Sequence, residues 1–237
     1  GGLSEEVIND RVRDILRVKF LVGLFDHPYQ IDLKGADEEV EKAANEEIAL
    51  QASRESIVLL KNDKNILPLD ASGIQKIAVC GPNADEHSYA LTHYGPLAVE
   101  VTSVLKGIQE KMKGKAEVLY TKGCDLVDAN WPESELIDYP LTDEEQKEIE
   151  KAVDQAKQAD VAVVVLGGGQ RTCGENKSRS SLDLPGRQLD LLKAVAATGK
   201  PVVLVLINGR PLSINWADKF VPAIVEAWYP GSKGGKA

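Results

Sequence analysis

Hydrophobic and polar positions along most of the chain alternate between short apolar runs and longer amphipathic stretches. From residue 76 onward the apolar runs are KIAVC (76–80), EVLYT (117–121), VAVVVL (161–166), PVVLVLIN (201–208) and AIVEAWY (223–229). Runs this short and this rich in β-branched residues predict strands, and the stretches between them predict helices over roughly 102–112, 143–159, 187–197 and 212–219. This alternation predicts a three-layer α/β/α sandwich around a mostly parallel sheet.

The first 62 residues follow a different pattern. Apolar residues recur at helical spacing from Val7 to Phe20, directly after Ser4, and predict an amphipathic helix with Ser4 as its N-cap. We expect an extended linker over 29–36, a second helix over about 37–53 and a short strand in SIVLLKN (56–62). The first helix needs a partner for its apolar face, which indicates that it belongs to something that precedes the sandwich.

The apolar run 161–166 stops at three glycines, and a polar loop follows before Pro185 introduces the next helix. Reactive groups in open α/β sheets collect at such strand ends. By its position, Glu175 is the strongest candidate for a catalytic carboxylate, although a glutamate on a polar loop is often only solvated. Gln170 and Arg171 are candidates for binding a polar ligand, or equally for fixing the loop by bonding backbone carbonyls.

Two long loops leave the carboxyl ends of the strands at 76–80 and 117–121, so we expect both to lie near the glycine-rich loop. Aromatic rings on these loops are of a kind that stacks on sugars, and the alternative is that they pack the loops against the sheet. The residues concerned are Tyr89, His93, Tyr94, Trp131 and Tyr139.

Composition and motifs exclude several classes of function. The net charge is −9 and basic residues are not clustered with aromatic ones, which argues against nucleic-acid binding. No apolar run is long enough to span a bilayer, and the three cysteines lack the spacing of a zinc site or a disulfide framework. The glycines at 167, 168, 169 and 174 do not form a G-x-G-x-x-G motif, and no G-x-S-x-G elbow is present.

Five segments together resemble the C-terminal α/β-sandwich domain of glycoside hydrolase family 3, the β-glucosidases and their relatives. They are SIVLLKN with ILPL (56–62, 66–69), KIAVCGPNAD (76–85), the stretch from VVVLGGG to LDLL (163–192), KPVVLVLINGRPLSINW (200–216) and AIVEAWYPGSKGGKA (223–237). The opening INDRVRDILRVKFLVGLFDHPY (8–29) is similar to the end of that family's preceding (β/α)8 barrel domain and the linker after it.

The resemblance implies a retaining β-glycosidase of β-glucosidase or β-xylosidase type. An Asp on the barrel is the nucleophile, and a Glu on a loop of the sandwich is the general acid and then the general base. That Glu follows the third strand in the pattern G-E-x-x-x-R-x-x-L-x-L-P, which places it at Glu175, between Gly174 and Arg179. No metal or organic cofactor is implied, the partner is a glycoside, and similar enzymes are often periplasmic or extracellular.

The resemblance also gives an expected domain organisation. Residues 1–35 are expected to be the tail of the barrel domain with the interdomain linker, and residues 36–237 the sandwich domain, cut short at its C-terminus. Without the barrel and its nucleophile, the chain alone is expected to lack glycosidase activity. Two other classes of function stay open, a carbohydrate-binding module without catalysis and a nucleotide-binding α/β domain.

Overall fold

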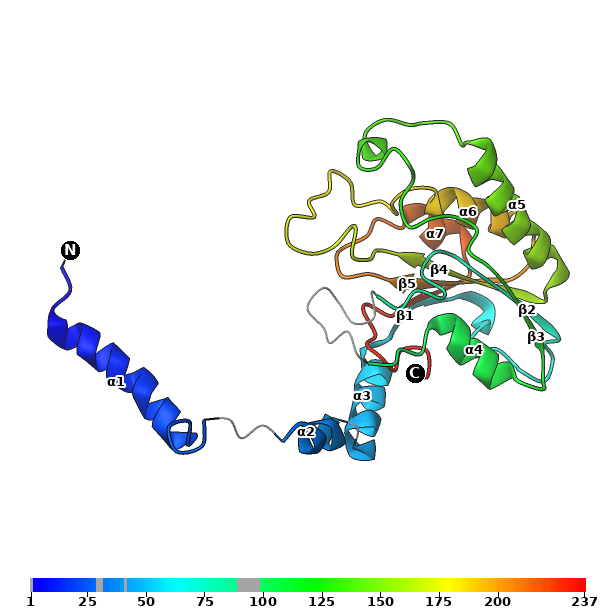
Figure 1. Ribbon diagram of the computed structural model, residues 1–237. Coiled ribbons are helices and arrows are strands. Elements are labelled where there is room, and N and C mark those ends of the chain that lie inside the picture. Colours follow the sequence, from blue (N-terminus) through cyan, green and yellow to red (C-terminus); the bar gives the residue numbers. More distant parts are fainter. Residues whose placement is uncertain (1, 29–31, 41, 89–98) are drawn as a thin grey trace. The chain divides into compact units, whose positions relative to one another are not determined.

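The computed structural model describes residues 2–28, 32–40, 42–88 and 99–237 (Figure 1). By their contacts the residues form two compact units, Gly1–Asn45 and Glu46–Ala237. The larger unit contains the whole sheet and the candidate site, and each unit is treated by itself below.

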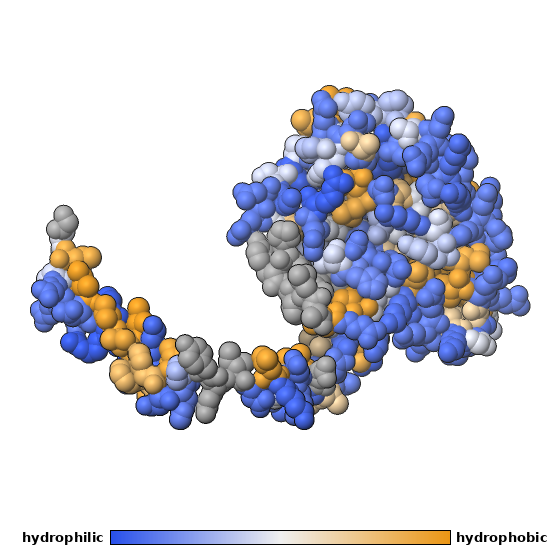
Figure 2. Space-filling view, in the orientation of Figure 1, coloured by the Kyte–Doolittle hydropathy of each residue, from blue (hydrophilic) through white to orange (hydrophobic). Residues whose placement is uncertain are grey.

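The smaller unit begins with helix α1 (Glu5–Leu21), as the apolar spacing predicts. The Ser4 hydroxyl accepts a hydrogen bond from the Val7 amide at 3.4 Å, and Glu5 and Glu6 lie in the first turn, where the helix dipole favours acidic groups. None of its residues is buried. Apolar side chains appear as an orange stripe along this helix in Figure 2. Ile15 and Phe20 are among its exposed large hydrophobic residues.

The predicted boundaries of the linker (29–36) and of the second helix (37–53) are wrong. Helix α2 (Leu33–Val40) occupies part of the stretch assigned to an extended linker, and a separate helix α3 (Ala43–Ser56) follows. The Asp32 side chain accepts from the Gly35 amide at 2.9 Å and so caps α2 within the stretch predicted as a linker. The Asn45 side chain donates to the carbonyl of Glu39 near the end of α2 at 2.6 Å, which helps separate the two helices.

The larger unit is built on a six-stranded sheet with the strand order β1-β6-β5-β4-β2-β3. Its strands are β1 (Val58–Asn62), β2 (Lys76–Cys80), β3 (Glu117–Thr121), β4 (Val161–Gly167), β5 (Val202–Ile207) and β6 (Ala223–Glu226). Strand β1 is antiparallel to β6, and all other neighbouring pairs are parallel. The predicted mostly parallel sheet is therefore confirmed, and the carboxyl ends of five strands share one edge.

Helices cover both faces of this sheet (Figure 1). The helices α5 (Asp143–Gln158), α6 (Gln188–Ala196) and α7 (Asn215–Phe220) pack on one face, and α4 (Val104–Met112) packs on the other. Helix α5 begins with a capping box, in which Thr142 and Glu145 bond each other's backbone amides. The predicted three-layer sandwich is confirmed.

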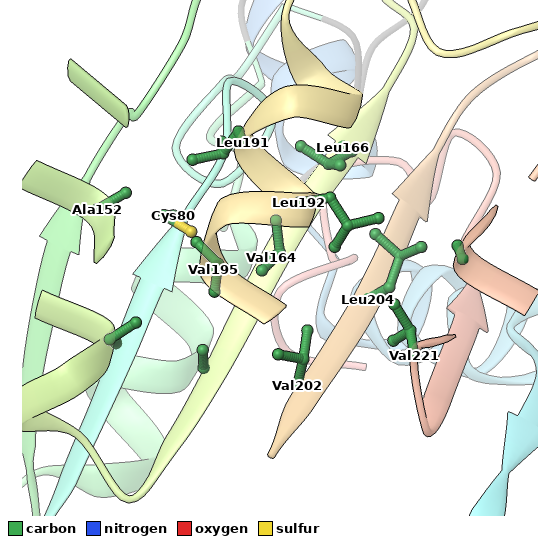
Figure 3. Packing of buried hydrophobic residues seen from close by; sticks show 14 of the residues in the cluster. Cys80, Ala152, Val164, Leu166, Leu191, Leu192, Val195, Val202, Leu204 and Val221 are labelled. Carbon is green, nitrogen blue, oxygen red and sulfur yellow. The ribbon is translucent and has the colours of Figure 1, made fainter. Parts of the chain in front are cut away.

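Strand β4 lies at the centre of the core, and its side chains alternate between the two faces. Val164 and Leu166 pack under α6, together with Leu191, Leu192 and Val195 of that helix, as Figure 3 shows. Val163 and Val165 point into the cluster on the α4 side. Because both faces are buried, every residue of the strand is apolar or glycine, which explains the uninterrupted run in the sequence.

Strand β4 ends at Gly167 because the backbone there turns into a conformation that only glycine adopts freely, with φ +139°. A Cβ atom at this position would lie 2.0 Å from the Ile207 carbonyl oxygen. We therefore expect Gly167→Ala to lower the free energy of unfolding by about 3 kcal/mol, measured by urea denaturation.

The matched control is Gly73→Ala, because a Cβ atom there meets nothing closer than 3.8 Å. That variant should unfold within about 0.5 kcal/mol of the wild type. Equal stability of the two variants would contradict the account of the strand end.

Candidate active site

The glycine segment after β4 is held by hydrogen bonds on every amide. The Gly167 amide donates to the Gln188 side chain at 2.7 Å, the Gly168 amide to the Ile207 carbonyl at 2.8 Å, and the Gly169 amide to the Thr172 hydroxyl at 3.0 Å. A phosphate-binding loop needs such amides free to face the ligand. These contacts disfavour the nucleotide-binding interpretation.

Gln188, the first residue of α6, joins three segments beneath the loop. Its side chain is fully buried, and besides accepting from Gly167 it donates to the carbonyls of Gly167 and Leu126, both at 2.9 Å. The Asn83 side chain, from the loop after β2, donates through Nδ2 to the Gly168 carbonyl at 2.7 Å. As predicted, the loops that follow β2 and β3 meet the glycine-rich loop at the carboxyl edge of the sheet.

The far end of the glycine-rich loop is anchored by Glu135, which belongs to a short 3-10 helix (Glu133–Glu135) in the loop after β3. One carboxylate oxygen of Glu135 accepts from Arg179 Nε, and the other accepts from the Ser180 amide at 2.7 Å and the Ser180 hydroxyl at 2.8 Å. The Arg179 and Glu135 side chains are only 3% and 4% exposed. We call these three residues the Glu135 anchor.

The charges of this anchor are matched. Burial alone would raise the pKa of Glu135, but the bonds from the Ser180 amide, Arg179 and the Ser180 hydroxyl, together with the Arg179 charge, outweigh it and lower the pKa. Glu135 is therefore ionised at neutral pH. Arg179 also donates to the carbonyl of Asp183 at 2.7 Å, which ties the end of the loop to the approach of α6.

Trp131 supports the anchor from the same loop as Glu135. The Arg179 guanidinium lies over its ring, 5.4 Å from the ring centroid, and the indole is half-buried. Tyr139 bonds Glu133 on the same loop. Both contacts fit the alternative in which these rings pack the loop. Tyr89, His93 and Tyr94, which share the prediction, lie outside the described residues.

Glu175 lies between the two held ends of the glycine-rich loop. Its neighbours Gly174 and Asn176 both have positive φ, +134° and +58°, so the backbone turns sharply on either side of it. The Glu175 side chain is exposed and makes no hydrogen bond or ion pair with another described residue. Arg179 is committed to Glu135, and neither Arg171 nor Lys177 pairs with Glu175.

Gln170 and Arg171 line a pocket of about 370 Å³ beside the loop, together with residues of the other two loops, among them Glu86, Lys122 and Asp125. The Gln170 side chain donates to the Ser88 carbonyl at 3.4 Å, so part of its bonding capacity already fixes a loop. Arg171 is exposed and makes no such contact with the described residues. The two candidates therefore differ in how free they are to bind a ligand.

A second polar cluster at the same edge was not predicted. Glu226, at the end of β6, accepts from Asn208 and from the Trp228 amide, both at 2.8 Å, and burial raises its pKa despite these bonds. The Cys173 thiol, on the glycine-rich loop, contacts the Gly209 carbonyl at 3.7 Å and the Tyr229 hydroxyl. These contacts fasten the start of the loop to the segments after β5 and β6.

The remaining reactive groups are structural or dispersed. Cys80 is buried in the core, as expected, and burial raises the pKa of its thiol to about 12. Within the described part of the chain, no three His, Cys, Asp or Glu side chains converge so that they could hold a metal ion. No helix that the structure describes has the length and apolar character that a membrane span requires.

The sequence profile of the glycosyl hydrolase family 3 C-terminal domain matches residues 57–237. This range includes all six strands of the sheet and the loops described above. The chain belongs to glycoside hydrolase family 3. The family 3 resemblance proposed from the sequence is thereby confirmed, and the matched region contains Glu135, Glu175 and Arg179.

Named relatives agree with this family. A β-xylosidase of Formosa agariphila is 41% identical over 97% of this family 3 chain, and a periplasmic β-glucosidase of Salmonella typhimurium is 37% identical over all of it. The solved structure of a β-glucosidase from Erythrobacter marinus superposes with a TM-score of 0.79 at 36% identity over 94% of the chain, and the chain covers 31% of that structure. The chain spans only 30% and 32% of the two curated relatives.

The ionised state of Glu135 makes a pH-dependent contribution to stability. At neutral pH we expect Glu135→Gln to lower the free energy of unfolding by about 3 kcal/mol, because it leaves the Arg179 charge buried without its partner. Because the folded-state pKa of Glu135 is lowered, this difference from wild type is complete above about pH 4.3, the ordinary glutamate pKa. It shrinks as the pH falls through the folded-state pKa, where wild-type Glu135 becomes neutral too.

Urea unfolding of both proteins over a pH series measures this difference. The exposed Glu144→Gln, in the first turn of α5, is the control and should lower the free energy of unfolding by less than about 1 kcal/mol at any pH, because it removes only an exposed charge near the start of the helix. A difference between Glu135→Gln and wild type that stays constant from neutral to acidic pH would show that the Glu135 charge is not what holds Arg179.

Proposed function

We propose that this chain supplies the general acid/base, Glu175, and one wall of the substrate cleft of a retaining β-glycosidase of β-glucosidase or β-xylosidase type. The observation that carries the proposal is the contrast within one loop. Both of its ends are bonded to neighbouring segments, whereas the Glu175 carboxylate between them is exposed and bonds to no described residue. A proton donor for an external substrate needs this combination of a fixed backbone and an available carboxyl group.

The local sequence supports the same assignment. The family pattern G-E-x-x-x-R-x-x-L-x-L-P corresponds to residues 174–185, and three of its members have a clear structural task here. Arg179 makes the buried ion pair, and Leu184 and Pro185 are buried at the entry to α6. Leu182 is 55% exposed, and Glu175 is the one polar member of the pattern whose side chain bonds to no described residue, which supports a chemical task for it.

The nucleophile is proposed to lie outside this chain, on a barrel domain, and the chain by itself to be inactive. The short coverage of the relatives supports this. So does α1, whose apolar stripe is unburied. We assign residues 1–35 to the end of that barrel and the linker, and residues 36–237 to the sandwich domain. A periplasmic or extracellular location is proposed by analogy with the relative named as periplasmic.

The chemistry takes two steps. In the first, the nucleophilic carboxylate attacks the anomeric carbon while the protonated Glu175 gives its proton to the departing glycosidic oxygen. In the second, the Glu175 carboxylate takes a proton from water, which attacks the anomeric carbon and releases the nucleophile. In retaining glycosidases the two carboxyl groups stand about 5–5.5 Å apart, which places the acid and the nucleophile on either side of the scissile bond.

In the complete enzyme we expect Glu175→Ala to lower kcat on a glycoside with a poor leaving group by about 10²- to 10⁴-fold. Azide should restore turnover of a substrate with a good leaving group by replacing the base-assisted water, with formation of a glycosyl azide of retained configuration. Steady-state rates and product analysis measure both effects. Glu144→Ala, an exposed carboxylate on α5, should behave as wild type, and full activity of Glu175→Ala would refute the assignment.

Arg171 and Gln170 are proposed to contact the sugar from the pocket beside the loop, with Arg171 the freer of the two. We expect Arg171→Ala to raise KM about tenfold, equivalent to about 1.4 kcal/mol of binding, with little change in thermal stability because Arg171 makes no hydrogen bond or ion pair with the described residues. Gln170→Ala should lower stability as well, because its bond to the Ser88 carbonyl is lost. An unchanged KM in Arg171→Ala would remove this residue from the binding site.

A further inference from the structure

We propose that Glu135 is a positioning residue for Glu175: from a neighbouring loop, it fixes where the acid/base carboxyl group stands. This inference rests on the proposed function of Glu175 and adds a residue that neither the sequence pattern nor the family resemblance singles out. Glu135 and Glu175 are 40 positions apart in the sequence, on the loops after β3 and β4.

The position of Glu175 depends on two anchors. Before it, the amides of Thr172 and Cys173 both donate to the Gly169 carbonyl at 3.0 Å. After it, Arg179 and Ser180 bond Glu135. Between these anchors the backbone carries one hydrogen bond among described residues, from the Lys177 amide to the Gly174 carbonyl at 3.2 Å. Removing the second anchor would therefore free the backbone on one side of Glu175.

The ionised carboxylate of Glu135 fits this task better than any neutral group. Both of its oxygens face donors, Arg179 Nε on one side and the Ser180 amide and hydroxyl on the other. A glutamine at this position would point an NH₂ donor at one of these two donor groups. Since both side chains of the ion pair are almost fully buried, water would replace the lost bond only if the loop moved.

The loop that carries Glu135 is itself well held. Asp128 accepts from the Asn130 amide at 2.8 Å and from the Ser134 hydroxyl at 2.6 Å, next to Glu135. The Leu126 carbonyl accepts from Gln188 under the sheet edge. Glu135 is thus a fixed point on the sandwich, and with both oxygens engaged and its side chain buried it is not placed to exchange protons with substrate itself.

This role has a kinetic consequence. Proton donation requires the acid within hydrogen-bond reach of the glycosidic oxygen, and a misplacement of about 1 Å can cost about 10²-fold in rate. A leaving group that is a stable anion departs without a proton, so the loss depends on the leaving group. A residue that only stabilises the fold would change the amount of active enzyme and reduce all rates equally.

The test uses the complete enzyme and a series of glycosides of one sugar, from a dinitrophenyl glycoside through nitrophenyl and phenyl glycosides to an alkyl glycoside. For each, kcat/KM is measured, because it reports the glycosyl-transfer step. Glu135→Gln is expected to lose less than about threefold on the dinitrophenyl glycoside and about 100-fold on the alkyl glycoside. Glu133→Gln, an exposed residue on the same 3-10 helix, is the matched control and should match wild type across the series.

The outcomes separate this inference from the proposed function. Glu175→Ala is run on the same series, and if it shows no leaving-group dependence the acid/base assignment itself fails. If Glu175→Ala shows the dependence but Glu135→Gln loses the same factor on every substrate, the positioning role alone is overturned. Should Glu135→Gln not fold, Ser180→Ala, which removes one of the three hydrogen bonds that Glu135 accepts, is measured on the same series. The same criterion then applies, with a smaller difference expected between the dinitrophenyl and the alkyl glycoside.

Discussion

The contact between Glu135 and Arg179 connects the two loops on which the candidate site depends. A buried ion pair adds little net stability compared with an apolar pair of the same size, but breaking it leaves a buried charge without a partner, which is costly. Such a pair therefore determines which arrangement the chain adopts more than it adds to the free energy of unfolding. Here it fixes the end of the loop that carries Glu175. The Trp131 ring over Arg179 and the Ser180 bonds to Glu135 restrict the same loop end further.

The site is held from the sheet outward. The core around β4 fixes Gly167, the buried Gln188 side chain ties Gly167 to the loop after β3, and that loop presents Glu135. Cys173 and Tyr229 fasten the start of the glycine-rich loop to the segments after β5 and β6. The polar groups named in these contacts bond to other parts of the protein. Glu175 is exposed and bonds to no described residue, which fits the acid/base role proposed for it.

Most of the fold could be predicted from the sequence, because a strand buried on both faces leaves an uninterrupted apolar run such as 161–166, and helices leave caps such as Ser4. The Glu175 loop was also predictable, from its place after a central strand and from the family pattern. The Glu135 anchor could not be predicted from the sequence, because it joins residues 44 positions apart. Nothing in the local sequence distinguishes a buried glutamate on a polar loop from an exposed one. Gln188 did leave a weak signal, a polar residue at the core-facing start of a helix. The division into α2 and α3 does not follow from the apolar pattern, because the start of α2 is set by the Asp32 cap within a short polar stretch that is also typical of a linker.

The most direct measurement is a crystal structure of the complete protein with a non-hydrolysable glycoside in its cleft. The account predicts that a Glu175 carboxylate oxygen lies about 2.6–3.2 Å from the glycosidic oxygen, with the bonds from Glu135 to Arg179 and Ser180 intact. It also predicts a second carboxylate, from outside residues 1–237, on the opposite side of the anomeric carbon. A different acidic side chain at the glycosidic oxygen, with Glu175 facing solvent away from the sugar, would contradict it.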